Sequence, residues 1–287
     1  GSTVTLTLNG QTYTGTVSGD SAVLVVAAAD LQALTEGSVA YTADVSDSAG
    51  NAAAQHSGSF AYDATAPSVA TSAFGFDAVL NATEDDGDAT LTLTTSGVED
   101  GNTVTLAMNG QTYTGTVSSD SASLVVAAAD LQALTEGAVA YTVDVSDSAG
   151  NAATQHSGSF TYDASASIAS SGFDFDGLLN ATEDDGDATL TVATADVDDG
   201  STVTLTLNGQ TYTGAVSSGS ASIVVAAADL QALTEGTVAY TADVSDSAGN
   251  AATQHSGSFT YDASASIASS GFDFGTALNA TEDDGDA

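Results

Sequence analysis

The sequence predicts an all-β protein made of tandem antiparallel β-sandwich domains, about 99–100 residues per repeat, each with one short helical crossover. The stretch GSTVTLTLNGQTYTGTVS at Gly1 returns, with few changes, at Gly101 and Gly200, so the repeats are 100 and 99 residues apart. That spacing is the size of a domain with its own core and is too long for one unit of a solenoid. Within each repeat, apolar residues alternate with threonine, and Asn-Gly pairs mark tight turns.

Composition narrows the possible partners. The chain has 38 acidic residues and no Lys or Arg, which gives a net charge of −38. Nucleic acid and anionic membrane surfaces are therefore excluded as partners, because binding to either depends on Lys and Arg. The absence of Cys excludes disulfides and thiolate metal sites. No apolar run reaches the roughly 18 residues of a membrane span, so we expect no membrane insertion in this segment.

The first half of the middle repeat predicts four strands. Apolar and threonine residues alternate with a period of two, which is typical of half-buried strands. The Asn109-Gly110 pair is the signal for a two-residue hairpin turn between the second and third of these strands. The expected strands cover residues 90–94, 103–108, 111–117 and 122–127.

The period then changes over residues 127–137, AAADLQALTEG. Asp130 is predicted to cap the start of a short helix, and Gly137 to mark its end. Leu131 and Leu134 are spaced as i and i+3, so both should face the core. This segment is interpreted as a single helical turn that crosses between two sheets.

Alternation returns after the crossover, over residues 138–145 and 154–162, with a turn between them at residues 147–151, DSAGN. Short strands joined by turn residues and one crossover predict an antiparallel sandwich. Tyr141 stands where a tyrosine corner is expected. One histidine recurs per repeat on the core-facing side of the last strand, as His56, His156 and His255.

These residues resemble a known family. The segment VVAAADLQALTEGAVAYTVDVSDSAGN at 125–151, followed by FTYDAS at 160–165, is similar to the tandem bacterial immunoglobulin-like repeats of giant secreted RTX-type adhesins and biofilm-associated proteins. The resemblance covers all three repeats, and its most specific parts are the crossover, the DSAGN turn and the YDATAP boundary at 62–67. It implies immunoglobulin-like sandwiches with calcium at their joints, located outside the bacterial cell.

The family's boundaries divide the chain into four parts. Residues 1–62 (the first repeat) are expected to lack their first two strands, and residues 63–162 (the middle repeat) and 163–261 (the third repeat) to be whole domains. Residues 262–287 are expected to hold the first strand and acidic loop of a further domain. We interpret the chain as an excerpt from a continuous array. Strand exchange between copies is less expected, because the tail would leave the equivalents of 189–199 missing.

The stretch NATEDDGDA, here called the acidic loop, occupies residues 81–89 and returns at 180–188 and 279–287. Four of its nine residues are carboxylates. Each like-charge pair ~6 Å apart costs about 0.7 kcal/mol in water before screening. The chain must therefore either solvate this loop in salt or place a cation there.

The resemblance also implies where these acids meet. In an immunoglobulin-like sandwich the acidic loop should face the next repeat, whose DSAGN turn faces back, so a joint gathers both together with the linker aspartate. Carboxylate and Asn oxygens suit a hard ion with about six to eight oxygen ligands, which favours calcium over zinc. The alternative is that they are solubilising surface acids of a salt-adapted protein. The predicted calcium ligands are Asp47, Asn51, Asp63, Glu84, Asp85, Asp86, Asp88, Glu99, Asp100, Asp147, Asn151, Asp163, Glu183, Asp184, Asp185, Asp187, Asp196, Asp198, Asp199, Asp246, Asn250 and Asp262.

The leading hypothesis for function is a structural extender, or stalk, of a secreted bacterial surface adhesin or extracellular filament, rigidified by Ca²⁺. Its partners are the neighbouring repeats of the same chain, with lateral self-association in a matrix as a further possibility. The alternative is a carbohydrate- or surface-binding module of a biofilm matrix protein, which would use exposed Thr and Ser. No enzyme is expected, because no G-x-S-x-G motif is present and near-identical copies suit architecture better than catalysis.

Overall fold

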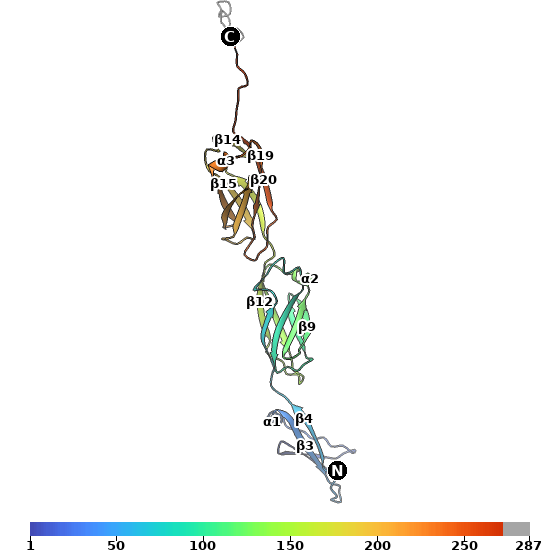
Figure 1. The fold of residues 1–287 in the computed structure, drawn as a ribbon. Helices are drawn as coiled ribbons and strands as arrows, with labels where there is room; N and C mark the ends of the chain where they lie inside the picture. The colour runs from blue at the N-terminus through green and yellow to red at the C-terminus, as the bar shows by residue number, and fades with distance from the viewer. Residues whose placement is uncertain (272–287) are drawn as a thin grey trace, which may run out of the picture. The chain divides into compact units, whose positions relative to one another are not determined.

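The computed structural model describes residues 1–271 as short β-strands with one short helix in each repeat (Figure 1). The acidic loop at 279–287, and with it most of the fragment predicted over 262–287, lies outside these described residues. The first repeat contains β1 (Thr3–Leu8), β2 (Gln11–Thr16), α1 (Ala28–Gln32), β3 (Gly37–Val45) and β4 (His56–Tyr62). The middle repeat contains β5 (Ser68–Phe74), β6 (Val79–Leu80), β7 (Ala89–Ser96), β8 (Thr103–Met108), β9 (Gln111–Thr116), β10 (Ser121–Val126), α2 (Ala128–Leu131), β11 (Gly137–Val145) and β12 (His156–Tyr162). The third repeat contains β13 (Ser167–Phe173), β14 (Leu178–Asn180), β15 (Ala188–Ala195), β16 (Thr202–Leu207), β17 (Gln210–Ser217), β18 (Ser220–Val225), α3 (Ala227–Leu230), β19 (Gly236–Asp243) and β20 (His255–Asp262).

The predicted hairpin turn is confirmed. Asn109 and Gly110 have φ values of 48° and 76°, so both adopt the left-handed conformation that a type I′ turn requires. The turn pairs β8 with β9 in antiparallel register, from Thr103 opposite Thr116 to Met108 opposite Gln111. The Asn-Gly signal therefore fixes which side chains of this hairpin face the core.

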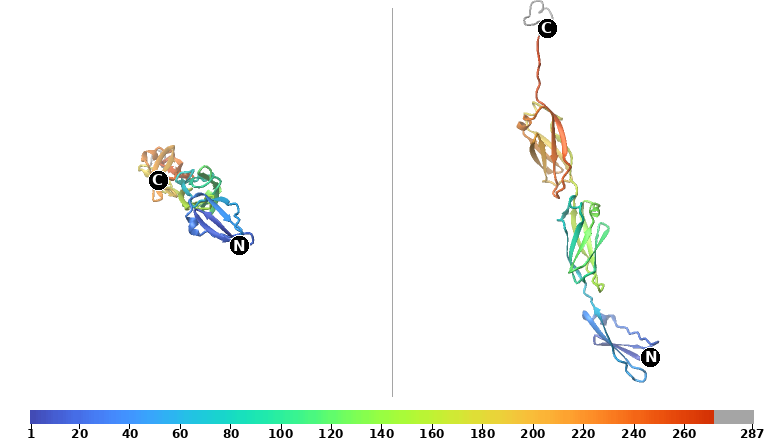
Figure 2. Two further views of the ribbon diagram at one scale, coloured as in Figure 1. Left: turned by 90° about the horizontal axis from the view of Figure 1, so that it is seen from below. Right: turned by 45° about the vertical axis from the view of Figure 1, so that its right-hand side comes forward.

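The third repeat shows the sandwich most completely. Its strands follow the order β13-β15-β18-β17-β16-β19-β20-β14, and a short pairing of β17 with β18 joins the two layers into one continuous sheet. Figure 2 shows these strands from two further directions. Neighbours are antiparallel except β14, which pairs in parallel with β20, as Leu178 does opposite Thr260. The all-β fold class of tandem immunoglobulin-like sandwiches is confirmed.

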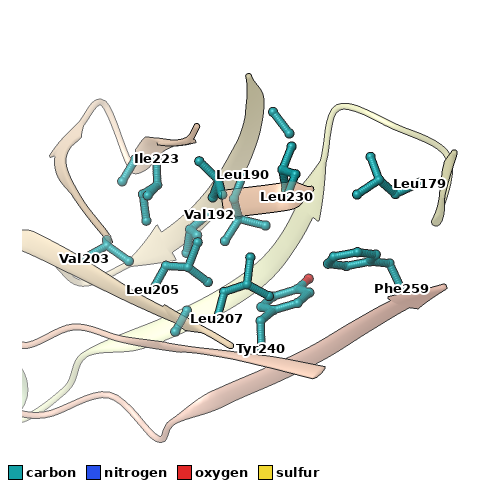
Figure 3. Packing of buried hydrophobic residues seen from close by; sticks show 14 of the residues in the cluster. Leu179, Leu190, Val192, Val203, Leu205, Leu207, Ile223, Leu230, Tyr240 and Phe259 are labelled. Carbon is teal, nitrogen blue, oxygen red and sulfur yellow. The ribbon is translucent and has the colours of Figure 1, made fainter. Parts of the chain in front are cut away.

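The core of the third repeat lies between these layers (Figure 3). Leu190 and Ile223, from one layer, and Leu205, from the other, are fully buried. Phe173 on β13 meets the ring of Tyr240 edge-on, with centroids 5.4 Å apart. Burying each such aliphatic side chain contributes roughly 1.5–3 kcal/mol, which is how a repeat of this size holds together without disulfides.

The middle repeat has two sheets, with orders β10-β7-β5 and β6-β12-β11-β8-β9. Phe74 meets Tyr141 edge-on at 5.4 Å, and Ser72 Oγ lies 3.0 Å from the Tyr141 hydroxyl and 2.9 Å from His156 Nε2. The predicted tyrosine corner is therefore wrong, because the hydroxyl reaches a side chain on β5 instead of nearby backbone. His156 is half-buried at this contact, as the strand pattern predicts.

Residues 1–62 form a single four-stranded sheet with the order β2-β1-β3-β4. Leu31 and Phe60 are each 40% exposed, whereas the equivalent Leu131 and Phe160 of the middle repeat are 0% and 7% exposed. The difference arises because the middle repeat covers this face with a second sheet. His56 is accordingly exposed.

The predicted capping role of Asp130 is wrong. Helix α2 begins at Ala128, so Asp130 lies inside its first turn, where its carboxylate accepts a hydrogen bond from the Tyr113 hydroxyl at 3.1 Å. The N–H of Ala128 is instead bound by Asp88 of the acidic loop, 3.0 Å away. Asp88, which lies 40 residues earlier in the chain, thus binds a free N–H group at the start of the helix, as a neighbouring N-cap residue usually does. Across residues 1–271, no helix has the length and apolar character needed to cross a membrane.

Candidate functional site

The acidic loop turns one of its predicted ligands into the interior of its own repeat. Asp85 is 5% exposed and accepts a hydrogen bond from the Tyr162 hydroxyl at 2.6 Å. Asp184 and Tyr261 repeat this contact in the third repeat, also at 2.6 Å. Burial, together with the bond to Asp85, raises the pKa of Tyr162 to about 12. These two aspartates therefore fasten the loop to the last strand of the repeat and point away from solvent.

The other acids of the loop bind N–H groups of their own repeat. Asp86 accepts from Gln132 Nε2 at 3.1 Å, and Glu84 accepts from the backbone N–H of Asn81 at 3.1 Å. Glu183, Asp185 and Asp187 repeat the contacts of Glu84, Asp86 and Asp88 in the third repeat. The charge of the loop is thus matched mainly by backbone and amide donors.

The predicted ligands around each DSAGN turn also bind N–H groups. Asp246 accepts from both the backbone and side-chain nitrogens of Asn250, at 2.8 and 2.7 Å. Asp198 accepts from Ser247, through its hydroxyl and its N–H, and these bonds lower the pKa of Asp198. The same arrangement recurs in earlier repeats with Asp47, Asn51, Asp147, Asn151 and Glu99. Asp100 and Asp199 brace a different turn, by accepting from the N–H groups of Ser119 and Ser218.

The acidic loop of the middle repeat meets the turn of the third repeat. Asn81 Nδ2 donates to the carbonyl of Ala248 at 3.0 Å, and the N–H of Ala82 donates to Asn250 Oδ1 at 2.9 Å. Asn250 Nδ2 in turn donates to the carbonyl of Asp163 in the linker at 2.8 Å. The structure therefore brings together acidic loop, linker and DSAGN turn, the three segments predicted to form a joint.

The acids that converge at this joint surround the linker. Burial raises the pKa of Asp163, and the negative charges of Asp246, Glu136 and Asp198 raise it further. Asp163, Asp196, Asp198 and Glu136 line one open hollow. With no Lys or Arg in the chain, no basic side chain can offset this repulsion.

Sequence reasoning missed Glu136, which it treated as part of the end of the helix. Its carboxylate accepts from the N–H of Ala164, just after the linker, at 3.1 Å. Glu36 and Glu235 make the same contact with Ala64 and Ala263, again 28 residues later. The signal was present in the sequence, because a TEG glutamate recurs at a constant distance before each linker aspartate.

The remaining linker aspartates are less enclosed. The carbonyl of Asp63 accepts from Asn151 Nδ2 at 3.2 Å, and its carboxylate accepts from the N–H of Thr65 at 3.1 Å. Asp262 is exposed at the end of β20, opposite Asn180.

The oxygen-only donor set at the Asp163 joint fits a hard cation such as calcium. Within residues 1–271, however, no three acidic or histidine side chains are gathered closely enough to form a ready metal cluster.

Comparison with solved structures identifies related proteins. The chain is 36% identical to a Ca²⁺-stabilized adhesin with which an Antarctic bacterium binds ice, over 93% of this chain and 66% of that one, with a TM-score of 0.44. It is 35% identical to a bacterial immunoglobulin-like domain of the M. primoryensis ice-binding adhesin, over 34% of this chain and 99% of that one, with a TM-score of 0.27. The chain belongs to the family of immunoglobulin-like tandem repeats of large bacterial adhesins. Sequence identity over a whole adhesin domain decides this assignment.

Other adhesin segments agree with it. The chain is 29% identical to part of a 1.5-MDa bacterial ice-binding adhesin, over 92% of this chain and 87% of that one, with a TM-score of 0.48. A tetra-tandem repeat from the extending region of a large adhesion protein is 26% identical, with a TM-score of 0.35. The chain spans about two thirds (66%) of that segment and of the Ca²⁺-stabilized adhesin. Neither a protein-family model nor a curated protein sequence matches. The relatives named above are thus segments of large bacterial adhesins, one of them from an extending region.

Proposed function

We propose that this adhesin segment is a spacer whose whole domains, residues 63–162 and 163–261, are held in line by calcium bound at the joints. The observation that carries the proposal is the set of acids around Asp163. The pKa of Asp163 is raised by burial and by repulsion from the carboxylates of Asp246, Glu136 and Asp198. A divalent cation in the adjacent hollow would remove that repulsion and favour the arrangement in which both repeats supply oxygen atoms.

The ligands best supported are those that surround the linker. Asp163, Asp196, Asp198 and Glu136 share the hollow, so they would hold the ion and supply most of the negative charge. Asp85 and Asp184 are the least suited of the predicted ligands, because each is buried against a tyrosine hydroxyl. The relative named for its Ca²⁺ stabilization supports calcium as the ion. At millimolar calcium and a Kd of ~10⁻⁴ M, a site would stabilise its joint by about 1.4 kcal/mol.

Calcium binding can be tested by measuring the freedom of the joint directly. The chain has no Cys, so single cysteines in place of the exposed Thr112 and Thr211 would carry spin labels on the middle and third repeats. We expect pulsed electron spin resonance to give a narrow distance distribution with calcium and a broader one with chelator. Asp163→Asn should remove most of this response. Asp120→Asn, which removes one exposed acid in the turn between β9 and β10, should leave it intact. An identical distribution with calcium and with chelator would refute the role of calcium.

Lateral association of such segments in a matrix is a second part of the proposal. The net charge of −38 keeps copies apart at low ionic strength, and divalent ions or high salt would reduce that repulsion. Light scattering across a salt series would detect it. A constant molecular mass at all salt concentrations would argue against association.

A further inference from the structure

Asn250 occupies an unusual position for a side chain in a surface turn. It is 6% exposed, and its amide uses both its donor and its acceptor capacity. Nδ2 donates to the carbonyl of Asp163 and to the carboxylate of Asp246, whereas Oδ1 accepts from the N–H of Ala82. One side chain therefore binds the acidic loop of the preceding repeat, the linker and its own turn at once.

The three copies of this asparagine form an internal comparison. Asn51 is exposed and its Nδ2 binds Asp47 of its own turn. Asn151 is half-buried and also reaches the linker carbonyl of Asp63, at 3.2 Å. Asn250 is the copy that follows a repeat with an acidic loop, and it alone of the three accepts a bond from that loop. Asn250 is therefore the copy whose side chain bridges its own turn, the linker and an acidic loop.

We infer that Asn250 is a metal-independent latch between neighbouring repeats, and that its partner is the backbone N–H of Ala82 at the start of the preceding acidic loop. The chemistry requires an amide, since a short side chain must accept from one N–H and donate to one carbonyl. Aspartate could accept from Ala82 but would turn an oxygen toward the carbonyl of Asp163, beside the carboxylate of Asp246. Alanine would leave the N–H of Ala82 and the carbonyl of Asp163 without this partner.

A second contact makes the latch specific for the acidic loop. Asn81, which opens the loop, donates through Nδ2 to the carbonyl of Ala248 in the same turn. The turn therefore binds the loop through two consecutive residues, Asn81 and Ala82. Oδ1 of Asn250 accepts an N–H from the loop, so this residue connects the two repeats through protein–protein hydrogen bonds, whether or not its second lone pair faces an ion. The latch does not depend on the proposed calcium function.

Amide hydrogen exchange of Ala82 in the full chain measures the latch directly. In the wild type we expect this N–H to be protected both with calcium and with chelator. Asn250→Ala should increase its exchange roughly fivefold or more, the effect of losing one hydrogen bond of ordinary strength. Asn250→Asp should also increase it, through the added charge. Asn151→Ala, the matched change in the preceding turn, should leave Ala82 unaffected. The N–H of Asp85, which bonds to the Asn81 carbonyl inside the loop, is the internal reference.

Each outcome decides the inference. Exchange of Ala82 at the rate of an unstructured peptide in the wild type with chelator would overturn it, and so would unchanged exchange in Asn250→Ala. If Asn250→Ala unfolds the third repeat, as the amides of β16 would report, the wild-type measurement with chelator still decides. If the wild-type protein shows no calcium response in the spin-label experiment while Ala82 is protected, the calcium proposal is refuted and the latch stands.

Discussion

Replacing Tyr162 with Phe tests whether the acidic loop is fastened to its own repeat. The Tyr162 hydroxyl is 2.6 Å from Asp85 Oδ2, and the two residues are 6% and 5% exposed. A hydrogen bond to a charged group contributes about 1.5–3 kcal/mol, and its loss leaves the carboxylate buried without that donor. We therefore expect the free energy of unfolding of the middle repeat to fall by about 2–3 kcal/mol.

The assay must separate repeats of similar sequence. Hydrogen exchange followed by mass spectrometry does so, because peptides from β7 and β15 differ in sequence and report the stability of the middle and third repeats separately. The third repeat serves as an unchanged reference in the same sample. Tyr113→Phe is the control substitution, since its half-buried hydroxyl binds Asp130 at 3.1 Å. It should cost less, about 0.5–1.5 kcal/mol, because Tyr113 and Asp130 are only half-buried and solvent screens the carboxylate.

Asp85→Asn completes the test, because asparagine keeps an acceptor for the tyrosine hydroxyl while removing the charge. We expect Tyr162→Phe to be less damaging in the Asp85→Asn background than in the wild type, as no buried charge is then stranded. If Tyr162→Phe costs no more than Tyr113→Phe, the buried pair does not fasten the loop. The same conclusion follows if the effects of Tyr162→Phe and Asp85→Asn on the free energy of unfolding are additive.

Two further predictions concern the same sandwiches. The pKa values of Tyr113, Tyr162 and Tyr261 are raised to about 12. Burial is the main cause for Tyr113 and Tyr162, and the bond to Asp184 is the main cause for Tyr261. The stability that these protonated hydroxyls contribute is therefore complete below pH 10 and is lost as the pH rises toward 12. Absorbance of tyrosinate should show these hydroxyls titrating late and together with unfolding; early titration would contradict the pairing. Gly257→Ala should destabilise the third repeat by about 1–3 kcal/mol, because a Cβ there would lie 2.3 Å from the ring of Tyr240. Gly172→Ala, on β13 with open space around it, should be nearly neutral in the same denaturation experiment.

The strands were predictable because each obeys a local rule. The predicted strand over 103–108 coincides with β8, and that over 138–145 differs from β11 by one residue. Threonine on one face and Leu or Val on the other reveal both the strand and its buried side. By contrast, β6 and β14 were missed, since two or three residues that pair in parallel with a distant strand have no alternation to detect.

The site was harder to predict because its hydrogen bonds are long-range. The sequence indicated Asp130 as the local helix cap, and only the fold brings Asp88 to the N–H of Ala128. From the sequence, Glu136 was interpreted as part of the end of the helix, and only the fold shows that its carboxylate accepts a hydrogen bond from the N–H of Ala164. The sequence located the three segments of the joint correctly, yet it could not distinguish acids satisfied by N–H groups from acids left facing one another.

That distinction supports the proposed position of the cation in a chain without Lys or Arg. Every carboxylate must then be balanced by solvent, by N–H donors or by a bound ion. Bonds from Thr65 lower the pKa of Glu36, and bonds from the Ser148 and Ser247 segments lower those of Glu99 and Asp198, so these acids are stabilised in the charged form by the protein itself. The pKa of Asp163 is raised instead, in the linker where acids of two repeats meet. The acidic loop is the most charged stretch of the sequence, but N–H and O–H groups already bind its carboxylates, which is why the cation is proposed at the acids around Asp163 instead.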